Sequence, residues 1–303
     1  DGIRDAQESR GLGDVYKRQI LEERKKKVLH FLKHNQQLFI WIGLLAIIFF
    51  FGFLIRTSNI ENLKDITTSN YTLGPDLDPF LALRWAKEIV KNGHLPAVDN
   101  MRNVPLGYVT KDELVLWPYS IAWLYQIMKF FNPAVSIEYA AIIYPVIFFM
   151  FSLLFMFLLV RKLFEEEGKL KSGLMALLST LLFSILPLLV HRTVAGIPEK
   201  ESPGMAFMLL SLYFFVCMLK SKDNKKSLLF GSLAGIATGL AGLFWGGFIL
   251  VFLGISLAML LSFFLSKIGK KEIIGYSAWI VLFTIILGIM TCLLYTSPSP
   301  RDS

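Results

Sequence analysis

Long apolar runs separated by short polar stretches dominate this chain. Several runs reach or approach the roughly 18 residues with which a helix crosses a bilayer. The pattern therefore predicts an all-α, polytopic membrane protein with about seven spans. The predicted spans cover residues 38–55, 137–160, 173–190, 205–219, 228–244, 248–265 and 273–290.

Positive charges decide how to interpret a further apolar run, residues 114–131. Lys and Arg gather before the first span and then after every second span, as they do in cytoplasmic loops. These basic stretches are 24–33, 161–171, 220–226 and 267–271. If 114–131 also crossed the membrane, every later basic stretch would lie outside. This run also contains Pro118, Gln126 and Lys129. We therefore predict an interfacial or re-entrant helix within one long outer loop, 56–136, and a cytoplasmic N-terminus.

Composition agrees with a membrane protein. The 303 residues are 54% hydrophobic, with a mean hydropathy of +0.56, which is more apolar surface than a soluble domain of this length needs. The formal net charge of +8 comes largely from the basic loops, so it indicates orientation in the lipid bilayer rather than affinity for nucleic acid. We expect a multi-pass protein of the cell membrane with no nucleic-acid partner.

The two ends of the chain differ from the rest. Residues 1–19 are polar without an apolar period, and residues 292–303 interrupt the last apolar run. Both segments resemble translated sequencing adapters, and such segments are excluded from fold reasoning. We therefore divide the chain into adapter-derived segments 1–19 and 292–303 and a transmembrane domain fragment, 20–291, which we expect to be truncated.

Two acidic pairs lie in outer loops according to this topology. Asp76 and Asp78 belong to the long outer loop, and Glu199 and Glu201 belong to a short outer acidic loop, residues 191–202. Carboxylates arriving from separate loops suit a hard divalent cation such as Mg²⁺ or Mn²⁺. Each pair alone is more typical of a solvated loop or a helix start. Their placement on the same face favours a metal site.

Asp78 also has a structural explanation. It precedes Pro79 and an amphipathic stretch that stops at Gly93, which predicts a helix with Asp78 as its N-cap and Pro79 as its first residue. Capping and metal binding are compatible, because a carboxylate has several lone pairs.

Glycines at every fourth position mark one of the predicted spans. They are Gly231, Gly235 and Gly239. This spacing lets two helices approach closely in lipid. We therefore predict a packing face here rather than a catalytic one.

Four short motifs follow one another on the predicted outer side. They are Asp78-Pro79-Phe80 with Arg84, Pro105-Leu106-Gly107, Arg192-Thr193-Val194-Ala195-Gly196 with Glu199-Lys200-Glu201, and Trp245-Gly246-Gly247-Phe248. In order and spacing, the chain from 20 to 291 resembles the catalytic subunit of oligosaccharyltransferase in its archaeal single-subunit form.

This resemblance implies a C-type glycosyltransferase-like transmembrane domain. It implies metal-dependent, en bloc transfer of a glycan from a dolichyl phosphate or pyrophosphate carrier to the Asn of an Asn-X-Ser/Thr sequon. The implied partners are the lipid-linked oligosaccharide donor and an acceptor polypeptide, and the implied active face is extracytoplasmic. The family's later spans and its soluble C-terminal domain have no counterpart in the sequence, so we expect the fragment itself to be inactive.

The resemblance also implies roles for the acids. By position, Asp78, Glu199 and Glu201 match the catalytic, metal-binding carboxylates, with Mg or Mn as the cofactor. Asp76 matches the first acid of its motif and is a further candidate ligand. The second motif departs from the family's commoner form, because glutamate stands at both acidic positions.

Two other functions remain open at this stage. Another C-type glycosyltransferase, using a polyprenyl-phosphate sugar, would share the fold and the first acidic motif. A membrane transporter or lipid flippase would instead carry ionisable residues at mid-membrane depth. The predicted spans are almost free of charge and the acids lie outside them, which disfavours the transporter or flippase.

Overall fold

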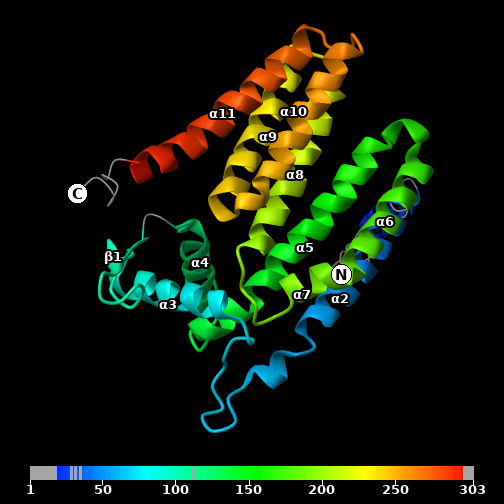
Figure 1. Ribbon diagram of the computed structural model, residues 1–303. Coiled ribbons are helices and arrows are strands. Elements are labelled where there is room, and N and C mark those ends of the chain that lie inside the picture. The colour runs from blue at the N-terminus through cyan, green and yellow to red at the C-terminus, as the bar shows by residue number, and fades with distance from the viewer. Residues whose placement is uncertain (1–18, 28–29, 31–32, 34–35, 111–112, 296–303) are drawn as a thin grey trace, which may run out of the picture. The chain divides into compact units, whose positions relative to one another are not determined.

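The structure, a computed structural model, describes residues 19–27, 30, 33, 36–110 and 113–295 (Figure 1). Its helices are α2 (Gln36–Thr57), α3 (Leu77–Asn92), α4 (Leu116–Phe131), α5 (Ile137–Leu163), α6 (Lys169–Ile185), α7 (Pro187–Thr193), α8 (Glu201–Leu219), α9 (Asn224–Phe244), α10 (Ile249–Phe264) and α11 (Lys270–Tyr295). Single turns of 3-10 helix are η1 (Ile60–Leu63), η3 (Glu165–Glu167) and η4 (Gly246–Phe248). Strands β1 (Val98–Asp99) and β2 (Tyr108–Val109) form an antiparallel pair.

The apolar runs form helices, as predicted, and the all-α fold class is confirmed. Among the described residues, six helices are long and apolar enough to cross a membrane. Helices α6 and α7 are together long and apolar enough to form a seventh span, but they are bent by 64° at a short break between them. The break falls at Leu186, and Pro187 begins α7 because proline fits the first turn of a helix but lacks the N–H needed further along.

The structure describes only a few residues of the two predicted adapter-derived segments, 1–19 and 292–303. The predicted adapter segment 1–19 lies outside the described residues except for its last position, and residues 296–303 also lie outside them. Residues 292–295 form the last turn of α11. Residues before 48 form a unit of their own, and its described residues are helical. The adapter origin of the two ends stays a prediction.

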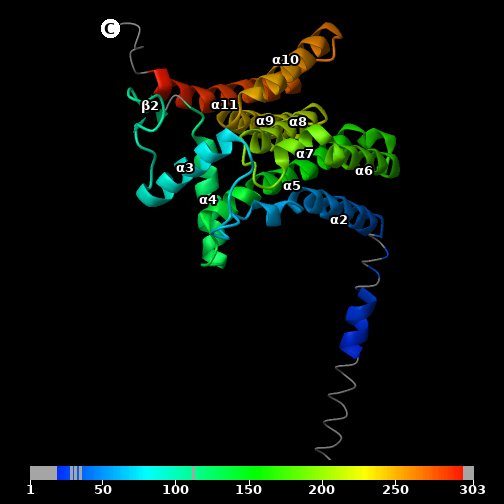
Figure 2. The same cartoon turned by 60° about the horizontal axis from the view of Figure 1, so that its bottom comes forward.

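Helix α4 occupies the apolar run that the charge pattern excluded from the spans. Its 16 residues rise about 24 Å, which is less than the roughly 30 Å of a bilayer's hydrocarbon core. It buries Trp117 and Ile121 in a core shared with α3 and α5. Figure 2 shows α3 and α4 beside one another, next to α5. The predicted outer loop, residues 56–136, thus contains a small helical layer.

The start of α3 corrects one sequence prediction. The N-cap is Asp76 rather than Asp78, and its carboxylate accepts a hydrogen bond of 2.7 Å from the Leu77 amide. Pro79 therefore occupies the third helical position. The first-turn amides have no intrahelical partner, so proline is tolerated there and does not fix the first residue. The predicted stop is confirmed, because Gly93 ends α3 in the left-handed conformation (φ 81°).

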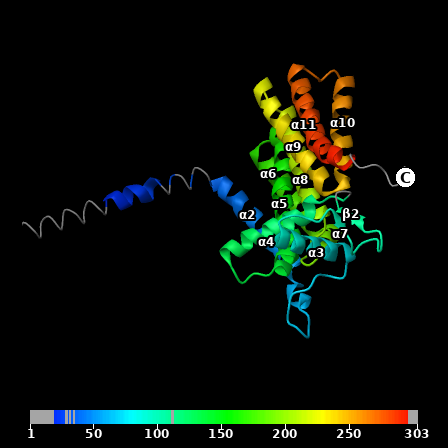
Figure 3. The same cartoon turned by 90° about the vertical axis from the view of Figure 1, so that its left-hand side faces the viewer.

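The glycine face of α9 packs as predicted. Figure 3 shows α9 beside α8 and α11. A Cβ atom placed on Gly231 would meet the backbone of Gly275, and one on Gly235 would lie 2.6 Å from the carbonyl oxygen of Trp279. Only glycine therefore permits α9 and α11 to approach this closely.

We expect Gly235→Ala to lower the free energy of unfolding by about 1–3 kcal/mol, because the added methyl group forces the two backbones apart. Gly254→Ala in α10 is the matched control, since a Cβ there would meet nothing within 4 Å. The control should gain up to about 1 kcal/mol from helix propensity. Thermal unfolding in detergent measures both variants, and equal stability for the two would contradict this packing.

The two ends of the helices differ in chemistry. At one end the basic connections meet: the Lys220 ammonium donates to the Leu163 carbonyl, and the Lys271 ammonium donates to the Ser221 carbonyl. The long outer loop and the acidic loop meet at the other end, where the Gly74 amide donates to the Gly196 carbonyl. The two acidic pairs therefore lie at one end of the helices, as the topology required.

Candidate active site

Backbone hydrogen bonds hold the acidic loop in place. The Ala195 amide donates to the Arg56 carbonyl at 2.8 Å, and the Gly196 amide donates to the Ile142 carbonyl at 3.0 Å. The Gly196 carbonyl in turn accepts from the Gly74 amide at 2.8 Å. These bonds join the loop to α2, to α5 and to the segment that leads into α3. The second acidic pair is therefore placed by three separate parts of the chain.

Side chains complete the attachment of the loop. The Trp117 indole of α4 donates a 2.7 Å hydrogen bond to the Pro198 carbonyl, directly before Glu199. The Asn59 amide group donates to the Ala195 carbonyl at 2.8 Å. At Gly196 the backbone has φ 90°, and a side chain there would collide with Leu63. The loop backbone is thus fixed on both sides of its glycine.

Arg56 lies beneath this loop and is completely buried. Its guanidinium donates to the Thr193 hydroxyl at 2.7 Å, to the Ser184 carbonyl at 3.0 Å and to the Gly52 carbonyl at 3.2 Å. It also lies 3.2 Å from the centre of the Phe149 ring. A single cation therefore joins α2 to the broken helix pair α6–α7, from whose end the acidic loop begins.

Acids from both loops meet at the acidic loop. Glu199 is 4% exposed, and one of its carboxylate oxygens accepts a 2.7 Å hydrogen bond from the Arg192 guanidinium. The carboxyl groups of Asp76 and Glu201 lie close enough to that of Glu199 to shift its pKa. One oxygen of Glu201, Oε2, is buried and has no hydrogen-bond partner. Three carboxyl groups and one guanidinium thus share a small, partly buried volume.

Proximity changes the acidity of these groups. Burial, followed by the hydrogen bond with Asp76, raises the pKa of Glu199 to about 7, and the nearby Glu201 adds to the rise. The hydrogen bond with Glu199 lowers the pKa of Asp76, with the Leu77 amide contributing as well. The more buried Glu199 therefore binds a proton more readily than the more exposed Asp76 does. A site that crowds carboxyl groups in this way favours an added positive charge.

Asp78 is placed differently from the other three acids. It lies exposed in the first turn of α3, directly after Leu77, whose amide donates to the capping Asp76 carboxylate. The structure therefore brings Asp76, Glu199 and Glu201 together and leaves the Asp78 side chain at the rim. Among the residues that the structure describes, no three His, Cys, Asp or Glu side chains are arranged to hold a metal ion.

Sequence reasoning missed several residues that build this site. Arg192 was part of a recognised motif, but nothing in the sequence paired it with Glu199. Trp117 and Arg56 gave no signal at all, because one is an aromatic residue in an apolar run and the other a single charge at the end of a span. Their roles depend on contacts between parts of the chain that are 81 and 137 residues apart.

A second ion pair fixes the helical layer next to the site. Asp99 of β1 is buried and accepts two hydrogen bonds from the Arg84 guanidinium of α3. It also accepts from the Trp85 indole at 2.9 Å and the Met101 amide at 3.0 Å. These bonds, chiefly those from Arg84, hold the pKa of Asp99 well below its usual range. The pair therefore attaches the strand pair to α3.

We expect Asp99→Asn to lower the free energy of unfolding by about 2–3 kcal/mol near neutral pH, because it removes charged hydrogen bonds from a buried site. Folding lowers the pKa of Asp99, so its stabilisation is fully present above the unfolded value of about 3.9 and is lost as the pH falls below it. Unfolding measured near pH 7 and near pH 3 should show the difference between parent and variant shrinking at low pH. A difference independent of pH would contradict the ion pair.

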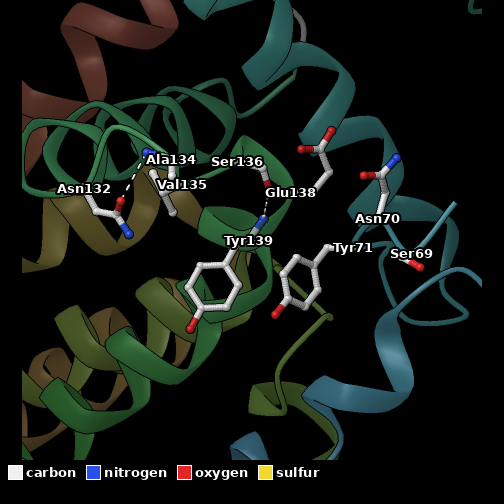
Figure 4. Close-up of a pocket in the computed structure, with 9 residues that line it drawn as sticks. All are labelled: Ser69, Asn70, Tyr71, Asn132, Ala134, Val135, Ser136, Glu138 and Tyr139. Carbon is white, nitrogen blue, oxygen red and sulfur yellow. Dashed lines mark hydrogen bonds between the residues drawn. The ribbon is translucent and has the colours of Figure 1, made fainter.

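A polar cavity of about 700 Å³ opens near the start of α5 (Figure 4). The rings of Tyr71 and Tyr139 lie 5.3 Å apart on its wall, and Glu138, which also lines it, forms a 2.6 Å ion pair with Lys87. Asn70, the first residue of an Asn-Tyr-Thr sequon, is exposed at its edge. The acids of the candidate site do not line this cavity.

Fold and site together define a class of protein: an all-α polytopic protein whose carboxylates gather in loops at one end of the helices. The family described as "Oligosaccharyl transferase STT3, N-terminal" matches residues 66–299. This match covers most of the 303 residues. The chain belongs to this family, and the suspected relationship to oligosaccharyltransferase is confirmed.

Similar proteins are archaeal enzymes. The dolichyl-phosphooligosaccharide-protein glycotransferase 2 of Archaeoglobus fulgidus is 26% identical over 172 residues, which are 57% of this chain and 26% of that protein. The dolichyl-phosphooligosaccharide-protein glycotransferase of Methanococcus voltae is 24% identical over 207 residues, which are 64% of this chain and 22% of that protein. The chain therefore spans about a quarter of the length of the curated relatives it matches.

Solved structures share the fold. The archaeal oligosaccharyltransferase AglB from Archaeoglobus fulgidus, in complex with an inhibitory peptide and a dolichol-phosphate, matches with a TM-score of 0.67 and 19% identity over 85% of this chain and 29% of that one. An Archaeoglobus fulgidus oligosaccharyltransferase in complex with Zn and sulfate matches with a TM-score of 0.67 and 20% identity over 84% of this chain and 32% of that one.

Proposed function

We propose that this chain is the N-terminal membrane part of an oligosaccharyltransferase that moves a glycan en bloc from a dolichyl phosphate or pyrophosphate carrier to the Asn of an Asn-X-Ser/Thr sequon. The observation that carries the proposal is the meeting of Asp76 with Glu199 and Glu201, which lie more than 120 residues further along the chain. A family match that includes both acidic loops supports it. The active face is the extracytoplasmic one in this proposal.

The acids hold and activate the acceptor side chain. An amide nitrogen is a poor nucleophile, so positioning and electrostatics must supply much of the rate. Carboxylates of Glu199 and Glu201 accept hydrogen bonds from the N–H groups of the acceptor amide and hold its nitrogen toward the donor. Arg192 keeps Glu199 oriented and balances part of the negative charge.

The donor set fits a divalent cation in chemical type. Glu201 has a buried oxygen without a partner, and burial together with the neighbouring acids raises the pKa of Glu199, so one guanidinium, that of Arg192, does not balance the three acids. Glu199 and Glu201, with Asp78 or Asp76 from the other loop, would hold Mg²⁺ or Mn²⁺. The ion would supply Lewis-acid stabilisation of negative charge. The crystal structure of a similar protein, the Archaeoglobus fulgidus oligosaccharyltransferase, is a complex with Zn and sulfate, which supports a divalent metal in this proposal.

Glycan transfer tests the function directly. The sequence should be joined to the remaining length found in its relatives, purified, and supplied with a dolichyl-linked oligosaccharide and a fluorescent peptide carrying a sequon. We expect a glycopeptide to form in the presence of Mn²⁺, and a matched peptide with Gln in place of the sequon Asn to stay unmodified. Transfer of a single sugar from a polyprenyl-phosphate sugar, with none from the oligosaccharide, would replace this function by the other C-type activity.

A further inference from the structure

A second cavity lies at the end of the helices opposite the acidic loop. It is open, with a volume of about 590 Å³, and lies between α5, α6 and α8. Its lining residues are Leu158, Arg161, Lys162, Glu165, Lys169, Ser172 and Tyr213. None of these residues takes part in the candidate active site, so the cavity requires a separate explanation.

Positive charge is in excess on the cavity wall. Three cations line it with one carboxylate, Glu165. That carboxylate is already occupied, because it forms ion pairs with Lys162 at 2.6 Å and with Lys220 at 3.9 Å. Within the described part of the chain, Arg161 and Lys169 form no ion pair with any carboxylate. Two cations thus face the cavity without a counter-ion from the protein.

The acidic residues nearest to these cations have partners elsewhere. In the turn between α5 and α6, Glu166 pairs with Lys220 at 3.2 Å and Glu167 pairs with Lys171 at 3.6 Å. The excess of positive charge on the cavity wall therefore remains, because the nearby acids pair with other lysines. An anion is the ligand that these two cations would bind.

The start of α6 adds to the attraction for an anion. Its N-cap is Gly168, which has no side chain to accept hydrogen bonds from the first-turn amides. Such amides, together with the helix dipole, favour negative charge next to the first turn. Lys169 and Ser172, both on the cavity wall, belong to this turn. The cations and the first-turn amides would therefore attract the same kind of ligand.

Apolar residues next to the cavity indicate which kind of anion it would bind. Leu158 and Tyr213 lie in helices that are candidate membrane spans, while Arg161 and Lys169 lie at helix ends. Leu163 is 48% exposed and Leu170 is 60% exposed. These two leucines directly follow the cavity-lining residues Lys162 and Lys169 in the chain. A bound molecule with a phosphate group and apolar chains would satisfy the cations and contact apolar residues of the spans such as Leu158.

We propose that this cavity binds the phosphate headgroup of an anionic membrane phospholipid, with Arg161 and Lys169 as its two principal contacts. The site is separate from glycan transfer and lies at the basic, predicted cytoplasmic end of the helices. Basic cavities between spans on that side of a membrane are suited to anionic headgroups.

Native mass spectrometry of the full chain in detergent tests the proposal. The chain is mixed with phosphatidylglycerol or with phosphatidylcholine that has the same acyl chains, and the retained lipid is counted. We expect phosphatidylglycerol to be retained preferentially. Arg161→Gln combined with Lys169→Gln should weaken that retention roughly ten- to thirtyfold. Arg161→Lys combined with Lys169→Arg should keep most of it, because both charges remain.

A matched control separates the cavity from the general field of the basic surface. Lys222→Gln combined with Lys225→Gln removes the same charge from the basic end without touching the cavity lining. Equal loss of lipid in the two double variants would overturn the proposal. Excess inorganic phosphate tests for the other source of this chemistry. If phosphate alone raised the melting temperature of the parent chain and displaced the lipid completely, the ligand would be free phosphate and the lipid proposal would be wrong.

Discussion

Glu199→Gln or Glu201→Gln should lower glycan transfer by about two to three orders of magnitude in a protein extended to the length of its relatives. Each substitution removes a negative charge from a site where preorganised electrostatics supply much of the rate. Glutamine keeps the size of the side chain, so the acidic loop should retain its fold. The measurement is the rate of glycopeptide formation at saturating acceptor peptide and limiting Mn²⁺.

The matched control is Glu61→Gln, which removes a carboxylate from the same end of the protein. Glu61 is exposed, and its one ion pair within the described residues is with Lys64. We expect its transfer rate to equal that of the parent. Binding of Mn²⁺, followed by calorimetry, gives a second measurement that does not depend on transfer. If Glu201→Gln bound Mn²⁺ and transferred glycan normally, the role assigned to the acidic loop would be wrong.

The first acidic pair poses a question that the same assays answer. The resemblance to the family motif favours Asp78 as the ligand, whereas the structure puts Asp76 close to Glu199 and leaves Asp78 exposed. Asp76→Ala and Asp78→Ala should therefore differ. If Asp78 is the ligand, its loss abolishes Mn²⁺ binding, and loss of Asp76 mainly weakens the start of α3. The reverse order would assign the ion to Asp76.

The sequence predicted the features that depend on local pattern. Apolar runs gave the spans, because a segment that must cross lipid has few alternatives to a helix. The charge pattern excluded α4 from the spans and placed both acidic pairs at one end. The stop at Gly93 followed from glycine's access to the left-handed region.

Features that depend on distant contacts could not be predicted. The start of α3 shifted by two residues from the prediction, because Asp76, Asp78 and Pro79 are all acceptable in a first turn. Asp99 lies in the long outer loop without any motif, and only the fold reveals that Arg84 and Trp85 converge on it. The apolar run 173–190 predicts one straight span, whereas the structure bends by 64° before Pro187.

Arg56→Met should lower the free energy of unfolding by about 2–4 kcal/mol, because three acceptors on α2 and the α6–α7 pair lose a charged donor. Loss of the bond to Thr193 should also loosen the acidic loop. Hydrogen exchange at the amides of Ala195 and Gly196 should therefore become faster. Arg56→Lys keeps the charge but not the planar fork of donors, so its effects should be intermediate.

Lys64→Met serves as the comparison, because Lys64 is an exposed cation of the same outer loop and pairs only at the surface. It should leave stability and loop exchange unchanged. If Arg56→Met lost stability while exchange at Ala195 and Gly196 stayed slow, the backbone bonds to Ile142 and Gly74 would be sufficient to hold the loop. Faster exchange together with weaker Mn²⁺ binding would instead show that a buried cation positions the carboxylates without touching them.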